Sequence, residues 1–255
     1  MSIHPWAQEG FSRGAYAYER ARPAYPTAAV SHLVDRLGLR PGATVMDLAS
    51  GTGKLARLLV RSGAHVVAVE PVRAMRELIP GDSIDVLAGT ADAIPLPAAA
   101  ADAVVVAQAF QWFQADAALA EIHRVLRPKG RLAIVRNRRD LDDPVQREFE
   151  EILDRHRSHP SLEAKLDVES AVHDTGFFQA GELSSFPNEY ELDSEDLVTL
   201  AGSETSISLL EDGAREGALA DFRRLAEVLP PRLRLRYTTE IYVAERVGDG
   251  KGSRR

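Results

Sequence analysis

Two patterns of hydrophobic positions alternate along the first 140 residues of the chain. Short apolar runs indicate buried strands, which we expect at 44–48, 66–69, 84–87, 102–107 and 131–135. Between these runs apolar residues recur at helical spacing, as in Val30, Leu33, Val34 and Leu37. Apolar strands that alternate with amphipathic helices predict a doubly wound α/β fold, in which helices cover both faces of a parallel sheet.

The second half of the chain has a different pattern. Val145, Phe149, Ile152 and Leu153 mark one face of a charged helix, and a further helix precedes Gly176. Two longer extended stretches, 177–192 and 233–247, bracket a helical insertion between residues 193 and 230. A long terminal strand reached in this way can pair antiparallel with its predecessor, and such an insertion can cap a site at the edge of the sheet.

Composition limits the classes of function. The 255 residues include no cysteine, which excludes a disulfide scaffold, a thiolate metal site and a cysteine nucleophile. No histidine spacing resembles a metal motif, so we expect no metal. A net charge of −7 suggests no nucleic-acid partner. We find neither a signal peptide nor an apolar run of membrane-spanning length, and therefore expect a cytoplasmic protein without a membrane partner.

The segment from Val45 to Leu55 carries the clearest chemical signal. A strand ends there, a loop of small residues turns tightly through Ala49, Gly51 and Gly53, and a helix begins. Such a loop lets a ligand lie against bare backbone and presents the unpaired amides of the helix N-terminus. Glu70 follows nineteen positions after Gly51, at the end of the second strand, where a carboxylate can accept both hydroxyls of a ribose.

The glycines alone leave two classes of cofactor open, because Gly51-x-Gly53-x-x-Ala56 also satisfies the loose nicotinamide dinucleotide fingerprint. Asp47 favours one of them. Its charge would repel a nearby pyrophosphate by an energy on the order of several kcal/mol. S-adenosyl-L-methionine has no phosphate and carries an ammonium and a sulfonium, which a carboxylate-lined cleft favours. Asp92, after the third strand, can accept from an adenine amino group, so the three acids predict a site at one sheet edge.

Several segments together carry a resemblance to a known family. They are Phe11…Tyr18…Arg22-Pro23-x-Tyr25-Pro26, Asp47-Leu48-Ala49-x-Gly51-Thr52-Gly53, Glu70-Pro71, Ala91-Asp92, Gln108-Ala109-Phe110-x-Trp112-Phe113 and Arg124-Val125-Leu126-Arg127-Pro128. With them the chain resembles the class I S-adenosylmethionine-dependent methyltransferases. It is similar above all to the type 11 small-molecule group, which includes ubiquinone-biosynthesis and trans-aconitate methyltransferases. The resemblance covers residues 11–140 well and the rest weakly.

The resemblance implies a mostly parallel, Rossmann-like sheet of seven strands, with the last strand antiparallel. It implies that Asp47 and the loop 49–53 surround the methionine part of S-adenosyl-L-methionine. Tyr18 and Arg22 would close over the cofactor, with Arg22 as a partner for its carboxylate. The complete set of cofactor-binding candidates is Tyr18, Arg22, Asp47, Ala49, Gly51, Gly53, Glu70, Pro71, Asp92, Ala93 and Gln108.

Other positions depart from the pattern of the family or leave two interpretations open. Ala49 stands where many relatives have a glycine, which is tolerable if its φ is negative. Gln111, Trp112 and Arg136 are candidates for the substrate pocket. A buried tryptophan, however, often has only a packing role. For Gln108 two interpretations remain, a contact with the cofactor or substrate and a hydrogen bond within the loop.

The arginine cluster at 136, 138 and 139 either holds an anionic substrate or is a solvated strand exit, the interpretation that we favour. His123 borders the sheet-packing face of a helix, so we expect a structural role, and we assign no catalytic residue.

Together these observations predict one domain over residues 1–248, with an N-terminal lid and helix at 1–40. A cofactor-binding core at 41–140 and substrate-side and cap elements at 141–248 follow, and a disordered tail at 249–255 ends the chain. The expected reaction is in-line transfer of a methyl group to a small-molecule acceptor that the sequence does not identify. The alternatives are a nicotinamide-dependent oxidoreductase and a non-catalytic protein that binds S-adenosyl-L-methionine. The oligomeric state stays open.

Overall fold

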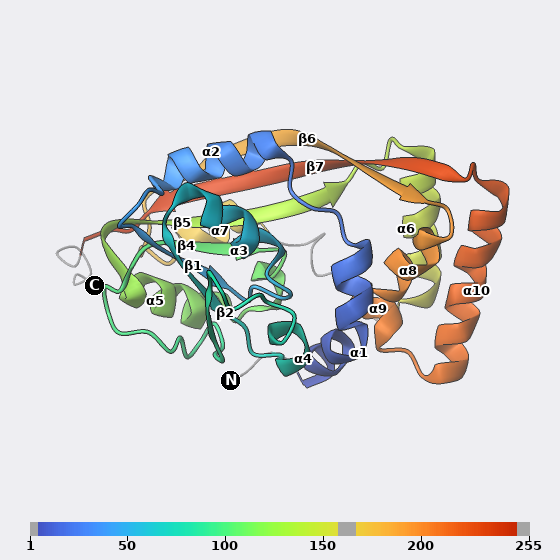
Figure 1. Cartoon of the computed structure of the whole chain (residues 1–255), viewed down its shortest axis with the longest axis horizontal. Coiled ribbons are helices and arrows are strands. Elements are labelled where there is room, and N and C mark those ends of the chain that lie inside the picture. Colours follow the sequence, from blue (N-terminus) through green and yellow to red (C-terminus); the bar gives the residue numbers. More distant parts are fainter. Residues whose placement is uncertain (1–4, 158–166, 249–255) are drawn as a thin grey trace.

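A twisted sheet forms the centre of the molecule (Figure 1). The computed structural model describes residues 5–157 and 167–248. The sheet has seven strands in the order β3-β2-β1-β4-β5-β7-β6. In chain order they are β1 Thr44–Leu48, β2 His65–Val69, β3 Asp85–Leu87, β4 Ala101–Ala107, β5 Leu126–Arg139, β6 Glu182–Asp193 and β7 Arg232–Glu245.

The first five strands pair in parallel, whereas β7 is antiparallel to both β5 and β6. The doubly wound sheet with an antiparallel last strand, expected from the sequence, is thereby confirmed. The carboxyl ends of β1, β2, β3 and β4 meet at one edge, where open α/β sheets bind ligands.

Helices cover both faces of the sheet. The described helical elements are α1 Pro5–Ala21, α2 Thr27–Leu37, α3 Lys54–Leu59, η1 Val60–Ser62, α4 Arg73–Arg76, η2 Phe110–Trp112, α5 Ala115–Val125, α6 Pro144–His156, α7 Val168–His173, α8 Asp196–Gly202, α9 Thr205–Ser208 and α10 Asp212–Val228. One face of the sheet packs against α2 and α3 through Leu33 and Leu59. The other packs against α5 and α7 through Ile122 and Val172.

The strands β6 and β7 extend past the rest of the sheet as a two-stranded ribbon (Figure 1). Burial along β7 alternates over residues 232–237 and becomes continuous over 241–244, where the strand enters the sheet. The ribbon carries a helical cap of α6, α8, α9 and α10, with a core of its own around Phe149, Leu200 and Phe222. The predicted helical insertion is thus a separate layer beside the sheet.

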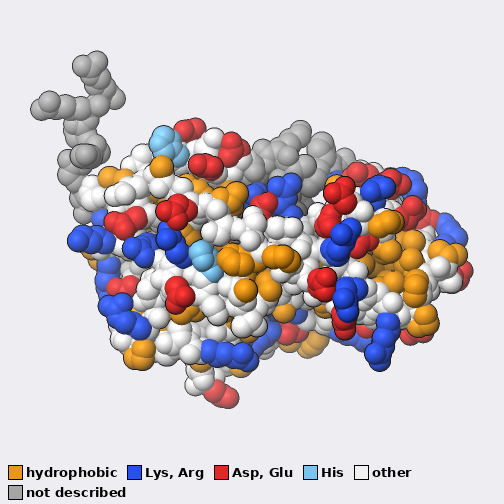
Figure 2. All heavy atoms as spheres, turned by 90° about the horizontal axis from the view of Figure 1, so that it is seen from above, with side chains coloured by type: hydrophobic (Ala, Val, Ile, Leu, Met, Phe, Trp, Pro, Cys, Tyr) orange, Lys and Arg blue, Asp and Glu red, His pale blue; other side chains and the backbone are white. Residues whose placement is uncertain are grey.

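Figure 2 shows apolar side chains exposed at the cap end of the molecule. A groove of about 710 Å³ lies there between α6 and α10, lined among others by Val145, Ile152 and Val228. It is formed by the cap and does not include the loops after β1, β2 or β4. None of the helices described is long and apolar enough to cross a membrane.

One strand differs from its predicted bounds. The sequence indicates a turn at 128–130 and a strand that ends at 135, but β5 begins at Leu126 and runs to Arg139. It extends because β7 supplies a partner for every residue from Arg131 to Arg139. The tail predicted at 249–255 lies outside the described residues, and the division of the chain into lid, core and cap stays a prediction.

Candidate functional site

The loop after β1 has unusual backbone geometry. Ala49, Gly51 and Gly53 have φ values of 55°, 57° and 78°, all in the left-handed region. A negative φ, the condition under which alanine would be tolerated without strain at position 49, is therefore not met. Gln108, the first residue after the neighbouring strand β4, also has a positive φ of 57°. Non-glycine residues rarely adopt this conformation, and such strain gathers at functional sites.

Four side chains at the same edge carry buried oxygen atoms without a hydrogen-bond partner in the part of the chain that the structure describes. These atoms are both carboxylate oxygens of Asp47, Oγ of Ser50, Oγ1 of Thr52 and Oε1 of Gln108. An unpaired buried polar atom costs about 1–3 kcal/mol, so folded proteins keep few of them. Their concentration at the ends of two adjoining strands and in the loops that follow marks a place where a polar ligand can supply the missing partners.

Two buried carboxyl groups give this edge its electrostatic character. Burial is the main reason that the pKa of Asp47 is raised to about 7, and the charge of Glu70 adds to it. The backbone N–H of Ala56 acts in the opposite direction and lowers the pKa of Asp47, although its position does not allow a regular hydrogen bond to the carboxylate. Burial also raises the pKa of Glu70 to about 7, against the amides of Val72 and Gly51 and the charge of Arg76. A positively charged ligand would stabilise the ionised form of both groups.

Glu70 also holds the loop in place. Its Oε2 accepts a hydrogen bond from the amide of Gly51 at 2.8 Å, and its Oε1 accepts one from Val72 at 2.8 Å. The next residue, Pro71, has its carbonyl bound by Arg76 at 3.2 Å. Because each carboxylate oxygen has two lone pairs, Glu70 can still accept from a ligand while it supports the loop.

The loop that carries Asp92 and Ala93 is fixed by α5. Glu121 accepts a hydrogen bond from the amide of Ile94 at 3.0 Å, and Arg124 donates to the carbonyl of Ile94 at 3.0 Å. The Arg124 side chain lies against Glu121 at 2.6 Å, so the two charges fix one another as well as the loop. This clamp holds the segment after β3 at the same edge as the glycine loop.

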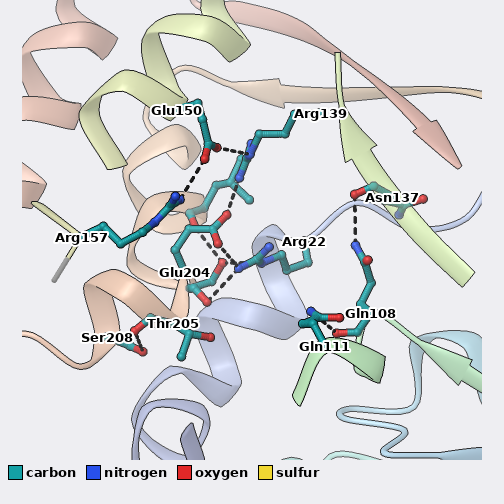
Figure 3. A network of polar contacts seen from close by, with 12 residues as sticks. Arg22, Gln108, Gln111, Asn137, Arg139, Glu150, Arg157, Glu204, Thr205 and Ser208 are labelled. Atoms are coloured by element: carbon teal, nitrogen blue, oxygen red, sulfur yellow. Dashed lines mark hydrogen bonds and ion pairs between the residues drawn. The ribbon is translucent and has the colours of Figure 1, made fainter. Parts of the chain in front are cut away.

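Helix α1 covers the glycine loop and joins it to the cap. The guanidinium of Arg22 lies 5.4 Å from the centroid of the Tyr18 ring. Cε1 of that ring is 4.0 Å from the position that a β-carbon would take at Gly51. On its other side Arg22 donates to the side-chain oxygen of Ser203 at 2.9 Å and pairs with Glu204 at 2.8 Å (Figure 3). The Tyr18 ring therefore lies between Arg22 and the glycine loop, and residues of the cap hold the Arg22 guanidinium.

The two glutamines after β4 lie together. Gln111 donates to the carbonyl of Gln108 at 3.1 Å, and Gln108 donates to the carbonyl of Asn137 at 3.3 Å (Figure 3). Trp112 is half-buried and packs on the core between the sheet and α5. The structure thus brings Gln108 and Gln111 together beside the end of β5, and it gives Trp112 a packing contact.

Comparison with known proteins identifies the family. A family model described as a methyltransferase domain matches residues 46–134. A methyltransferase-like protein of Schizosaccharomyces pombe is 31% identical over 241 residues, which cover 90% of this chain and 92% of the relative. The chain belongs to the methyltransferase family.

Two further comparisons agree with this assignment. An uncharacterized methyltransferase of Mycobacterium tuberculosis is 43% identical over 147 residues, which cover 57% of this chain and 59% of that relative. The match thus spans only about three fifths of the relative's length. A structure assigned as a type II methyltransferase of Anaeromyxobacter dehalogenans superposes with a TM-score of 0.64, at 25% identity over 88% of this chain and 97% of that one. The methyltransferase resemblance and fold predicted from the sequence are confirmed.

The arginine cluster of this chain differs from the sequence-based expectation. Arg138 is exposed, but the side chains of Arg136 and Arg139 are only 16% and 13% exposed, so a solvated strand exit is wrong for both. Arg136 pairs with Glu240 at 2.9 Å. That pair borders a small cavity of about 120 Å³ beside α7, and Gln108 and Gln111 do not line it. Arg136 therefore lies beside Glu240 at this cavity, and its place in a substrate pocket stays a prediction.

Sequence reasoning missed Glu204, the acid that lies between Arg22 and Arg139. It also missed a buried group in which Oδ1 of Asn137 accepts hydrogen bonds from Thr239 at 2.6 Å and Asn188 at 3.3 Å. These residues come from segments far apart in the chain, and no local spacing singles them out. Asn188 also fixes the carbonyl of Ala24 at 2.9 Å, just after α1.

His123 lies away from the site. Its Nε2 is 3.0 Å from the carbonyl of Val247, and its ring is 5.1 Å from that of Phe177. Val247 follows β7, whose last residue Glu245 pairs with Arg131 at the start of β5. His123 is therefore at the opposite edge of the sheet from the glycine loop, which agrees with the structural role expected for it.

The positive φ of Ala49 leads to a prediction about the stability of the protein. A non-glycine residue in the left-handed region costs roughly 1–2 kcal/mol, and the greater freedom of glycine in the unfolded chain offsets part of this. We expect Ala49→Gly to raise the free energy of unfolding by about 0.5–1 kcal/mol, measured by denaturant titration. Ala99, with a φ of 54° on an exposed loop, is the matched control and should show a similar gain. A gain at Ala99 with a loss at Ala49 would contradict the strain inferred for the glycine loop.

Proposed function

We propose that this chain uses S-adenosyl-L-methionine to methylate a small-molecule acceptor. The observation that carries the proposal is the set of unpaired buried oxygens of Asp47, Ser50, Thr52 and Gln108. They fit the cofactor, because its ammonium group donates hydrogen bonds and its two positive charges suit an edge with two buried carboxyl groups. A pyrophosphate would meet the same carboxyl groups as an anion, which argues against a nicotinamide dinucleotide.

The cofactor would lie along the strand ends. In this arrangement Asp47 and the loop 49–53 hold the amino-acid part, and Glu70 with Pro71 holds the ribose. Asp92 and Ala93 lie beside the adenine. Tyr18 closes over the loop, and Arg22 binds the carboxylate with the N–H groups that its contacts with the cap leave available.

The methyl group of the bound cofactor is already activated, because its sulfur is a good leaving group. The acceptor forms a bond to that carbon as the carbon–sulfur bond breaks, leaving S-adenosylhomocysteine, and the acceptor's proton is released to solvent. The residues of the chain position the reactants and exclude water, which can supply most of the acceleration. In this proposal Gln108 and Gln111 orient the acceptor, and no side chain is assigned as a general base.

Calorimetry and a turnover assay together test the proposal. We expect micromolar binding of S-adenosyl-L-methionine and S-adenosylhomocysteine and no comparable binding of NAD. A screen of carboxylic acids, phenols and amines with methyl-labelled cofactor should then reveal an acceptor. Tight NAD binding, or no binding of either sulfur compound, would overturn the assignment. Binding without turnover on any acceptor class would favour the non-catalytic alternative.

Helix α1 is expected to act as a lid over the bound cofactor. Its buried positions among the side chains described are all small, namely Gly10, Gly14, Ala15 and Ala21. Because small residues bury little apolar area, the part of this helix before Arg22 should separate from the cap and from α4 at low cost, while the ion pair of Arg22 with Glu204 holds its C-terminal end. We expect hydrogen exchange over residues 12–21 to slow about tenfold or more at saturating S-adenosylhomocysteine. Unchanged protection would instead indicate a permanently packed helix.

A further inference from the structure

A buried ion-pair network connects three separate parts of the chain. Glu204, between α8 and α9, pairs with Arg22 at the end of α1 at 2.8 Å and also with Arg139 at the end of β5 (Figure 3). The three side chains are between 13% and 21% exposed. Arg139 in addition stacks on Phe149 of the cap at 4.2 Å. The network therefore joins the helix over the cofactor loop to the cap and to the sheet.

The charges in this network are unevenly shared. Arg139 has a second acidic partner in Glu150 at 3.5 Å, and Glu150 in turn pairs with Arg157 at 2.8 Å. Arg22 has Glu204 as its one acidic partner among residues 5–157 and 167–248. Two guanidinium groups thus share Glu204, and a further anion beside Arg22 would reduce the excess of buried positive charge.

Arg22 is held by one side of its guanidinium. Nε donates to Oγ of Ser203 at 2.9 Å, and Nη2 donates to the carbonyl of Ser203 at 3.1 Å and pairs with Glu204. A guanidinium has five N–H donors in a rigid fork. The contacts recorded for Arg22 within the described chain use Nε and Nη2, so the two donors on Nη1 remain for another acceptor.

We propose that Glu204 is a positioning residue for the cofactor carboxylate. It fixes the plane of the Arg22 guanidinium through Nη2 and keeps the Nη1 edge available for the carboxylate of the methionine part. Without Glu204 the arginine regains freedom of rotation that binding must then remove. This inference rests on the proposed function, in which Arg22 binds that carboxylate.

The test compares two ligands that differ in the part Arg22 would contact. S-adenosylhomocysteine carries the amino-acid carboxylate, whereas 5′-methylthioadenosine shares its adenosine and thioether and lacks that group. For Glu204→Gln we expect the affinity for S-adenosylhomocysteine to fall about tenfold or more, with 5′-methylthioadenosine changed less than about threefold. The matched control is Glu150→Gln, which alters the same network without a contact to Arg22 and should leave both affinities unchanged.

The remaining outcomes separate this inference from the function on which it rests. An equal loss for both ligands, or no loss for either, would show that Glu204 does not position Arg22. Arg22→Lys should itself lower the affinity for S-adenosylhomocysteine and leave that for 5′-methylthioadenosine unchanged. If Arg22→Lys has this effect and Glu204→Gln does not, Arg22 binds the carboxylate but Glu204 does not position it. No binding of either ligand by the unaltered protein would remove the proposed function itself.

A milder variant keeps the test decisive if Glu204→Gln does not fold, since breaking a buried pair is strongly destabilising. Ser203→Ala removes the side-chain contact to Nε of Arg22 and leaves every charge in place. We expect it to lower the affinity for S-adenosylhomocysteine about threefold to tenfold and to leave the affinity for 5′-methylthioadenosine unchanged. A folded Ser203→Ala protein with an unchanged ratio of the two affinities would overturn the inference.

Discussion

Asp47→Asn is expected to stabilise the unliganded protein at pH 8 and to weaken its binding of S-adenosyl-L-methionine. The carboxylate is fully buried and has no hydrogen-bond partner among residues 5–157 and 167–248, so above pH 7 the free protein holds an uncompensated charge. Asparagine has nearly the same shape and removes that charge. The same change replaces the charged acceptor that would face the ammonium of the cofactor with a neutral amide, so affinity should fall about tenfold or more.

The direction of the pH dependence follows from the pKa of Asp47, which folding raises from 3.8 to about 7. Its contribution to stability is fully present below pH 4, decreases as the pH rises towards 7, and is level above that. The asparagine variant has no such contribution. Its advantage over the unaltered protein should therefore increase between pH 5 and pH 8, by roughly 3 kcal/mol for the two pH units below the raised pKa at 1.36 kcal/mol per unit.

Urea denaturation at pH 5 and pH 8 measures this difference directly. Asp82→Asn is the control, because Asp82 lies in the exposed loop before β3, and it should show no comparable change between the two pH values. If Asp47→Asn changes the free energy of unfolding by the same amount at both pH values, the buried carboxylate is not an uncompensated charge in the free protein.

Glu70→Ala is expected to lower the affinities for S-adenosylhomocysteine and 5′-methylthioadenosine to a similar extent, because both ligands contain the ribose. The loss of charge-assisted hydrogen bonds to the two hydroxyls predicts an affinity about ten- to a hundredfold lower. The variant also leaves the amides of Gly51 and Val72 without their acceptor, which loosens the glycine loop. This pattern differs from that of Glu204→Gln, which should spare the ligand without a carboxylate.

Calorimetry with both ligands on the folded variant tests this prediction. Glu77→Ala is a suitable control. Glu77 directly follows α4, seven residues after Glu70, but its side chain is exposed, and Arg73 is its one ion-pair partner in the described contacts. Binding of 5′-methylthioadenosine by Glu70→Ala with the affinity of the unaltered protein would show that Glu70 supports the loop and does not bind the ribose.

The order of elements and the edge that carries the site could be predicted from the sequence because both depend on local patterns. Helical spacing and short apolar runs distinguish helices from buried strands within a few residues. Parallel strands joined by helices bring their carboxyl ends to one edge, so Asp47, Glu70 and Asp92 could be placed there without knowledge of any long-range contact.

The tertiary structure alone decided the backbone conformation of Ala49, the burial of Arg136 and Arg139, and the partner of Arg22. Local spacing contains no information on these, since each depends on segments distant in the chain. Arg139 is buried because the ribbon of β6 and β7 carries the cap over the end of β5, and Glu204 reaches Arg22 from that cap. The sequence by itself therefore determined which strand ends meet. Packing of the cap against α1 and β5 determined which charges are buried there and which acid holds Arg22.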